Sequence, residues 1–403
     1  MTRHTGPSAA LGAAAASEPT RESSRAETVL RNLRLVLAND VIRATVQLID
    51  GRIAAVADGG TSVRGAIDLD GDYLLPGLVE LHTDNLERHM MPRPRTSFPA
   101  QPAILAHDAE LVAAGITTVL DAIGVGDPYD EGFRAADQGR LLELLDSLQA
   151  HGVLRADHHV HVRCELPAPN ARALFSAFEH SERVRLISLM DHTPGQRQWT
   201  NAEHARVYYT GKKGWTNARF DEELRLAPMR QAQHAQPNRR YFVDHARTRG
   251  VPLATHDDTT VSHVDEAHDE GASICEFPTT LAAARRAREL GMATIAGAPN
   301  VVRGGSHSGN VAAVELARAG LLDVLSSDYV PASLIHAAWQ LQRDADMSLP
   351  RSVATVSSNA AAAIGLADRG EVRPGARADL VRVREVHGHP AVRDVWTRGI
   401  RVH

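Results

Sequence analysis

The 403-residue chain is poor in cysteine and aromatic residues and has no long apolar run. Two cysteines, Cys164 and Cys275, are too few for a disulfide framework, so we expect a reducing, cytoplasmic location. No run of about 18 apolar residues occurs, so no membrane span is expected. The net charge of -5 is modest and argues against general nucleic-acid binding.

Lysine is the scarcest basic residue. The 44 basic side chains include only two lysines, Lys212 and Lys213, both in the Gly-Lys-Lys-Gly motif at residues 211–214. An ammonium group is a compact charge on a flexible stem, which suits contacts with phosphate oxygens. The motif therefore predicts phosphate binding, with a solvated turn as the alternative.

Composition and pattern divide the chain into three parts. Residues 1–27 are rich in Ala, Ser, Thr and Arg without the apolar stretch of a signal peptide, and we expect a disordered extension. Residues 28–75 and 350–403 contain short apolar runs and turns, including the hairpin signal Asp50-Gly51, and predict one small composite β domain. Residues 76–349 form the third part.

In this third part apolar strand patterns alternate with amphipathic helix patterns, which predicts a parallel sheet. Eight strands fit an α/β fold with a distorted (β/α)8 metal-dependent hydrolase barrel. The expected strands span residues 78–81, 116–122, 158–166, 184–191, 252–255, 273–277, 293–296 and 323–326. The expected helices include residues 135–149, 170–178, 281–290 and 311–319, and residues 193–241 form a long insertion.

Imidazole and carboxylate groups stand at the carboxyl ends of six expected strands, where barrel enzymes carry their chemistry. On the first strand Glu80, His82 and Asp84 share one face, because strand side chains alternate. Three imidazoles and several carboxylates suit Zn, with Mn or Fe as further candidates. The candidate metal ligands are His82, Asp84, Glu165, His192, His256 and Asp328, and Glu276 ends the sixth strand.

Two loops indicate anion binding. The glycine-rich loop at residues 297–310 follows the seventh strand, carries Arg303 and runs into a helix. Its backbone amides and the helix amino end favour phosphate. The loop after the fourth strand places Arg197 near the metal ligands, and Arg93 and Arg95 follow the first strand.

A second histidine cluster consists of His158, His159 and His161. These residues lie on or before the third strand, away from its carboxyl end, so a structural role is expected. Cys164 alternates away from Glu165 and is expected to be packed in the core.

The chain resembles the amidohydrolase superfamily in its Pro-Gly-Leu-Val-Glu-Leu-His segment at 76–82, its Gly-Ile-Thr-Thr-Val segment at 115–119, Asp328, and the Ala-Asp-Leu-Val segment at 378–381. Within it, residues 79–87, 188–198, 276–280 and 297–310 resemble the diphosphatases of the carbon–phosphorus lyase pathway. This resemblance extends over nearly the whole chain from about residue 29.

The resemblance implies a metal-dependent hydrolase of phosphonate metabolism that cleaves a ribose 1-methylphosphonate triphosphate and releases diphosphate. One or two divalent ions would serve as cofactor, and Asp328 would take the proton of the attacking water. Lys212, Lys213, Arg303 and Arg197 would neutralise the phosphates. The expected partner is this anionic sugar phosphate, with no nucleic acid or membrane, and a homo-oligomer is left open.

The chain departs from the superfamily pattern at three positions. Asp84 replaces the second histidine of His-x-His, His192 stands where many two-metal members have a carboxylated lysine, and Glu276 replaces a histidine. Glu165 is the natural substitute for the lysine, and the number of metal ions stays open. Two other functions remain: an amidohydrolase acting on a C–N bond, such as a deaminase or cyclic amidase, and a non-catalytic assembly protein.

Overall fold

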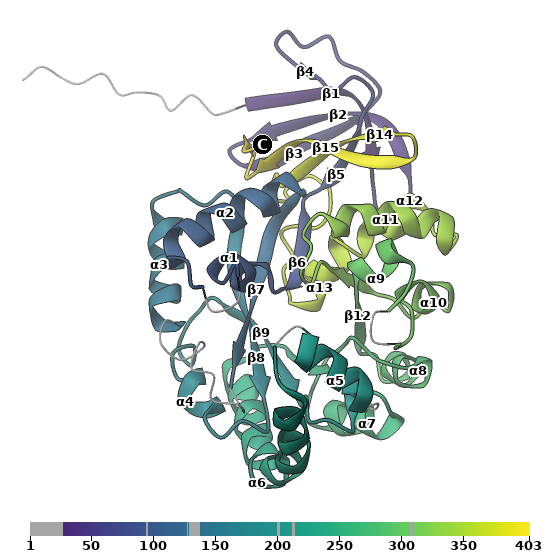
Figure 1. Cartoon of the computed structure of the whole chain (residues 1–403). Helices are drawn as coiled ribbons and strands as arrows, with labels where there is room; N and C mark the ends of the chain where they lie inside the picture. The colour runs from purple at the N-terminus through teal and green to yellow at the C-terminus, as the bar shows by residue number, and fades with distance from the viewer. Residues whose placement is uncertain are drawn as a thin grey trace, which may run out of the picture.

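The computed structural model describes residues 27–93, 96–126, 128, 138–199, 202–211, 214–306 and 309–403. The described chain forms two eight-stranded sheets, one a parallel barrel and the other mostly antiparallel. Helices surround the barrel, and the second sheet lies across one end of it (Figure 1).

The barrel strands follow one another in chain order, from β6 to β13. Every neighbouring pair is parallel, and a parallel bridge from Thr83 to Asp328 brings the last strand back to the first. All eight strands expected from the sequence are present, so the barrel prediction is confirmed. The strands are β6 (Leu78–Thr83), β7 (Ile116–Val125), β8 (Asp157–Glu165), β9 (Val184–Met190), β10 (Leu253–His256), β11 (Ile274–Glu276), β12 (Ala293–Gly297) and β13 (Val324–Ser326).

The helices lie between and after these strands. The expected insertion consists mainly of α5 (Ala202–Gly211) and the long α6 (Asn217–Arg249), which begins at the N-cap Thr216. The others are α1 (Asn85–Met90), α2 (Ala100–Ala113), α3 (Gln138–Ala150), α4 (Ala171–Phe175), η1 (Arg197–Trp199), α7 (Val261–Asp269), α8 (Leu281–Glu289), α9 (Ala298–Arg303), α10 (Ala313–Arg318), α11 (Ser333–Asp344), α12 (Leu349–Ala354) and α13 (Ser358–Ala363).

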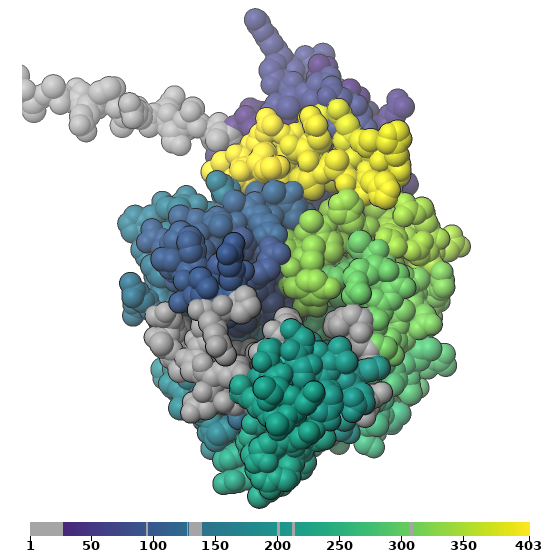
Figure 2. Space-filling model, viewed as in Figure 1, coloured from purple at the N-terminus to yellow at the C-terminus, as the bar shows by residue number. Residues whose placement is uncertain are grey.

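Both chain ends build the second sheet, as the sequence predicts. Its order is β16-β15-β14-β5-β1-β2-β3, with β4 paired to β1, so strands from the two ends meet where β14 pairs with β5. Figure 2 shows this domain, in purple and yellow, seated on the barrel. The strands are β1 (Glu27–Val36), β2 (Val41–Ile49), β3 (Arg52–Asp58), β4 (Ile67–Asp68), β5 (Tyr73–Pro76), β14 (Leu380–Val386), β15 (His389–Thr397) and β16 (Ile400–Arg401).

The junction between the sheets depends on Gly77. A Cβ atom at this position would lie 2.2 Å from Thr117 Oγ1 and 2.9 Å from Asp379 Cβ. Only glycine lets the chain pass so close to both neighbours as it leaves β5 and enters β6. The backbone N–H of Gly77 donates to the Asp379 carbonyl at 2.8 Å, which ties the domain to the barrel at this point.

The barrel interior is filled by apolar side chains from successive strands, as in other barrels of this type. Helix α13 closes its amino end, because Ala360, Ala361 and Ile364 belong to the same buried cluster as Leu81 and Leu120. The sequence boundary at residue 350 assigned α13 to the small β domain, whereas in the structure α13 contacts β6 and β13 of the barrel. Among the described residues no helix has the length and apolarity needed to cross a membrane.

A buried carboxylate joins the first strand to the last. Glu80 is fully buried and accepts the backbone N–H of His82 and of Ser327, each at 2.6 Å. Burial raises the pKa of Glu80 to about 7, although both N–H donors oppose this shift. Glu80 thus supports the closure of the barrel next to His82.

We expect Glu80→Ala to lower the free energy of unfolding by about 2–5 kcal/mol, because two buried N–H donors lose their acceptor. Glu80→Gln keeps one acceptor oxygen and should lose less. Urea unfolding measures both, with the exposed Glu143→Ala as a control that should stay within about 0.5 kcal/mol of the original chain. An equal effect of the two alanine variants would contradict this role of Glu80.

Candidate metal centre

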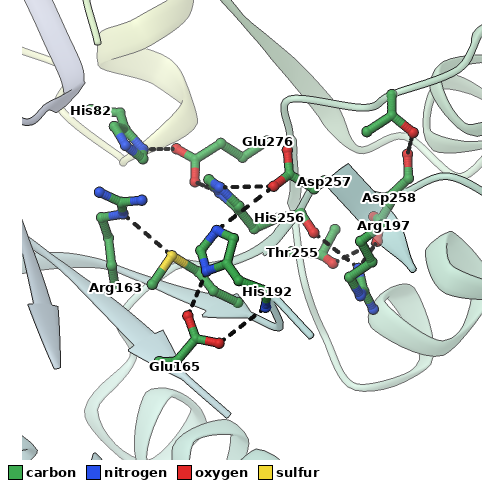
Figure 3. Close-up of polar contacts among 12 residues, drawn as sticks. His82, Arg163, Glu165, His192, Arg197, Thr255, His256, Asp257, Asp258 and Glu276 are labelled. Carbon is green, nitrogen blue, oxygen red and sulfur yellow. Dashed lines mark hydrogen bonds and ion pairs between the residues drawn. The ribbon is translucent and has the colours of Figure 1, made fainter. Parts of the chain in front are cut away.

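Imidazole and carboxylate side chains converge at the carboxyl end of the barrel (Figure 3). They come from β6, β8, β10 and β11 and from the turns after β9, β10 and β13. The strand ends therefore meet as the sequence predicts. Some carboxylates, however, face the Nδ1 atoms of the histidines, and others lie near the Nε2 atoms.

Glu276 is shared by two histidines. His82 donates from Nδ1 to Glu276 Oε1 at 2.7 Å, and His256 donates from Nδ1 to Glu276 Oε2 at 2.8 Å. Burial would raise the pKa of Glu276, but the nearby His82 and His161 rings hold it well below its usual value. The ionised carboxylate can only accept, so both Nδ1 atoms carry the proton and both Nε2 atoms are left with a lone pair.

His192 is oriented in the same way by Glu165. Its Nδ1 lies 2.5 Å from Glu165 Oε2, and its backbone N–H donates to Glu165 Oε1 at 3.0 Å. Burial alone would lower the pKa of His192, but the Glu165 carboxylate raises it above the usual value. The sequence analysis expected Glu165 as a direct ligand; in the structure its carboxylate faces His192 Nδ1.

Asp257 is a ligand candidate that the sequence analysis left unassigned. Its Oδ2 lies 3.4 Å from His256 Nε2 and 3.9 Å from His192 Nε2. The backbone φ of Asp257 is +56°, a left-handed conformation that is costly for a residue with a Cβ and that recurs at functional sites. Its position directly after the fifth strand was the available signal, because a carboxylate there shares the mouth of the barrel with His256.

His82, Asp84 and Asp328 form a second group of potential ligands whose atoms lie within 4.8 Å of one another. Asp84 Oδ1 is 3.8 Å from His82 Nε2 and 2.5 Å from Nη1 of Arg163. Arg163 on β8 is thus a charged residue of the centre that the sequence analysis did not assign. The sequence feature that indicates this is the alternation of side chains along a strand, which places Arg163 on the same face as Glu165, two residues later.

The backbone of Asp328 is bound to the first strand. Its N–H donates to the His82 carbonyl at 3.1 Å, and its own carbonyl accepts from Asp84 N–H at 2.8 Å. Asp328 has a φ of +54°, again left-handed. Burial and the neighbouring Asp84 charge raise the pKa of Asp328 to about 6, which makes this carboxylate a competent proton acceptor near neutral pH.

The donor set fits a divalent metal ion. Three imidazole Nε2 atoms are left available by Nδ1 hydrogen bonds, and Asp257, Asp84 and Asp328 offer oxygens within reach of them. Separations of 3.4–3.9 Å between donor atoms agree with ligands at about 2.0–2.2 Å from a common ion. Two groups of three ligands also leave room for either one ion or two.

The four cations expected to bind phosphate lie in different surroundings. Arg197 is buried and donates from Nη1 to Asp258 Oδ1 at 2.7 Å and to the His256 carbonyl at 2.9 Å. Arg303 is exposed in the last turn of α9. Lys212 and Lys213 lie outside the described residues, so their role stays a prediction.

Two histidines of the β8 cluster, His158 and His161, make hydrogen bonds within the fold. His158 Nδ1 lies 2.8 Å from Asp121 Oδ2, and His107 Nε2 lies 2.7 Å from Asp121 Oδ1. Ligands of one tetrahedral zinc ion would lie roughly 3.3 Å apart, so these shorter contacts are direct hydrogen bonds. His161 donates from Nδ1 to the Leu81 carbonyl at 3.0 Å and packs its ring edge on His82.

A cavity of about 540 Å³ lies between α1, α2, α3 and β7, and its described lining residues do not include the ligand candidates of the metal centre. Its lining includes Glu87, three residues after Asp84, and Ala122 and Ile123 near the end of β7. This volume falls in the range of small-molecule sites.

The fold and this centre define a metal-dependent hydrolase barrel, and the comparison with known families agrees. The model of the amidohydrolase family matches residues 100–402, and the chain belongs to that family. Solved structures share the fold at low identity. N-isopropylammelide isopropylaminohydrolase from Burkholderia multivorans superposes with a TM-score of 0.61 at 19% identity, covering 93% of this chain and 98% of its own. N-acetyl-D-glucosamine-6-phosphate deacetylase from Mycobacterium smegmatis gives 0.60 at 17%, covering 93% and 100%.

A curated relative is much more similar in sequence. Alpha-D-ribose 1-methylphosphonate 5-triphosphate diphosphatase of Escherichia coli (strain K12) is 46% identical over 380 residues. The match covers 93% of this chain and 100% of the relative.

We expect Glu276→Gln to weaken binding of a divalent ion about 10- to 100-fold. Each of the two imidazoles needs its own acceptor oxygen, and an amide offers only one. Competition with a metal-sensitive dye measures the affinity, and circular dichroism monitors the fold. Glu270→Gln is the matched control, since Glu270 pairs with Arg239 outside the centre. Unchanged metal affinity in Glu276→Gln would rule out this orienting role.

Proposed function

We propose that this protein is a metal-dependent diphosphatase of phosphonate catabolism. It hydrolyses alpha-D-ribose 1-methylphosphonate 5-triphosphate, releases diphosphate and leaves ribose 1-methylphosphonate 5-phosphate. The observation that carries the proposal is the 46% identity to the diphosphatase over the full length of that relative. The centre described above supports it, because its donors suit a divalent ion and its neighbourhood carries buried positive charge.

In this function His82, His192 and His256 hold the metal through Nε2, together with Asp257 and with Asp84 or Asp328. Glu165 and Glu276 orient the three rings. With one or two divalent ions bound there, zinc or alternatively manganese or iron, the site would gain an activated water and a group that polarises a phosphoryl oxygen. Such chemistry requires a fixed geometry of the rings, since small misplacements of a reacting group slow the reaction.

Asp328 is the proton acceptor in this proposal. Its carboxylate shares the ligand group of His82 and Asp84, and its backbone hydrogen bonds to β6 hold it in that position. It takes the proton of the attacking water as the bond from oxygen to phosphorus forms. Desolvation of Asp328 favours this transfer, because burial makes the carboxylate a stronger base.

The substrate is a strongly anionic sugar phosphate, and cations must oppose its charge. Arg303, Lys212 and Lys213 are proposed to contact its phosphates, with Arg197 on the loop after β9. A cytoplasmic location and a homo-oligomer both stay predictions.

The direct test is an assay of diphosphate release from the sugar triphosphate by the purified chain. We expect Asp328→Asn to reduce turnover at least about 100-fold, because the base is lost. Unfolding in urea should remain close to that of the original chain, which separates loss of the base from loss of the fold. Turnover of Asp328→Asn near the original rate would exclude Asp328 as the base. Ring opening of a cyclic amide, or release of ammonia from an amino-substituted ring, without diphosphate release would favour the C–N hydrolase.

The pKa of about 6 for Asp328 gives a pH dependence. The base form is needed, so kcat should fall about tenfold per pH unit below the pKa of Asp328 in the metal-bound chain, which lies below 6, and level off above it. Bound metal draws this limit to lower pH, because a nearby cation favours the carboxylate. A pH series of kcat at saturating metal measures this, with metal content checked at each pH. A rate that rises as the pH falls would contradict the assignment.

A further inference from the structure

Arg163 is a largely but not fully buried guanidinium at the metal centre. It lies on β8 two residues before Glu165, and its side chain is only 13% exposed. Burial would lower the pKa of Arg163, but Asp84 and, farther away, Glu87 and Glu276 raise it above the usual value, so the group stays charged. A buried charge is retained in a fold only where partners compensate for its lost hydration.

The contacts of Arg163 use few of its donors. A guanidinium has five N–H groups, and here Nη1 donates to Asp84 Oδ1 while Nε faces the weak acceptor Met190 Sδ at 3.3 Å. Nη2 has no hydrogen-bond partner among the residues that the structure describes. By contrast, the buried Arg382 bonds to three carboxylates, those of Asp70, Asp72 and Asp394. Arg163 therefore has donor capacity that the described fold does not use.

The guanidinium of Arg163 lies near the metal-facing atoms. Asp84 Oδ1 is 2.5 Å from Arg163 Nη1 and 3.8 Å from His82 Nε2, so one carboxylate separates the guanidinium from the nitrogen that faces the metal. Asp84 supplies one negative charge between the guanidinium and the metal-facing nitrogen, and a further anion would be attracted by both cations. A phosphoryl group suits this position, because its oxygens can face both cations and match the planar fork of arginine.

We propose that Arg163 is a substrate-binding residue that holds a phosphoryl oxygen of the triphosphate beside the metal, and that Asp84 positions its guanidinium. This inference rests on the proposed function, because it assigns a contact within the same site. It also explains a choice of substrate: a fixed buried cation stabilises a bound anion and offers nothing to an uncharged ring amide.

The probe is inorganic triphosphate, titrated calorimetrically into the full chain with and without its divalent ion. The metal-free arm removes chelation of the ion by the probe from the comparison. The variants are Arg163→Gln and, as a matched control, Arg185→Gln, which changes an exposed arginine at the amino end of β9. Arg163→Gln should weaken binding about tenfold or more in both arms, as expected for loss of a charge-assisted contact, and Arg185→Gln should change nothing. Binding of Arg163→Gln within twofold of the original chain overturns the proposal.

A second comparison covers the case in which Arg163→Gln fails to fold because Asp84 is left without its cation. Asp84→Asn and the double variant Asp84→Asn with Arg163→Gln differ only at position 163, and neither contains an unpaired Asp84 carboxylate. Asp84→Asn should bind inorganic triphosphate about tenfold more tightly than the double variant. Equal affinities would show that Arg163 serves only to order Asp84, and would overturn the proposal.

The two levels of inference fail separately. If the original chain releases no diphosphate from the sugar triphosphate, the proposed function fails, whatever the binding data. If it does release diphosphate and the affinity of the Arg163 variants for inorganic triphosphate is unchanged, only the role of Arg163 fails. A raised KM with nearly unchanged kcat in Arg163→Gln would place the contact in ground-state binding, whereas an equal fall in kcat and kcat/KM would place it in the transition state.

Discussion

The geometry of the metal centre depends on one carboxylate, that of Glu276, which binds two imidazoles at once. Because the His82 and His256 rings donate to its two oxygens, their Nε2 atoms point away from Glu276 into the mouth of the barrel. Glu165 orients His192 as Glu276 orients the other two rings. Two buried carboxylates thus fix the orientation of three imidazoles before any ion is bound.

This layer can form only if the barrel closes. Glu80 accepts N–H groups from both sides of the seam between β6 and β13, and the Asp328 backbone bonds to His82 and Asp84 at the same seam. The contacts that close the barrel therefore lie directly beside the candidate metal ligands. Left-handed φ values at Asp257 and Asp328 have the same origin, since a strand that ended in extended backbone would carry these carboxylates past the mouth of the barrel.

The sequence was sufficient to predict the architecture. Buried parallel strands read as short apolar runs, and those runs end in His82, His192 and His256, so the barrel and its imidazoles could be located without coordinates. The roles of the individual carboxylates could not be predicted from the sequence. Whether an acidic side chain meets a metal or a ring nitrogen depends on the register between strands, as where His256 pairs with Glu276 across β10 and β11. Local pattern placed Asp257 and Arg163 at the strand ends, but their roles depend on partners far away in the sequence, His192 for Asp257 and Asp84 for Arg163.

The chemistry of this centre follows from what surrounds the donors more than from the donors themselves. Three oriented imidazoles with carboxylates would serve the hydrolysis of an amide as well as that of a phosphoric anhydride, and the fold is shared with enzymes named for C–N substrates. A buried guanidinium is different, because it loses hydration free energy on folding, and a bound anion would compensate for that loss. Asp84 offsets part of that cost in the free protein. It also explains why an aspartate stands where the wider superfamily has a histidine: an imidazole could bind the metal, but it could not hold Arg163.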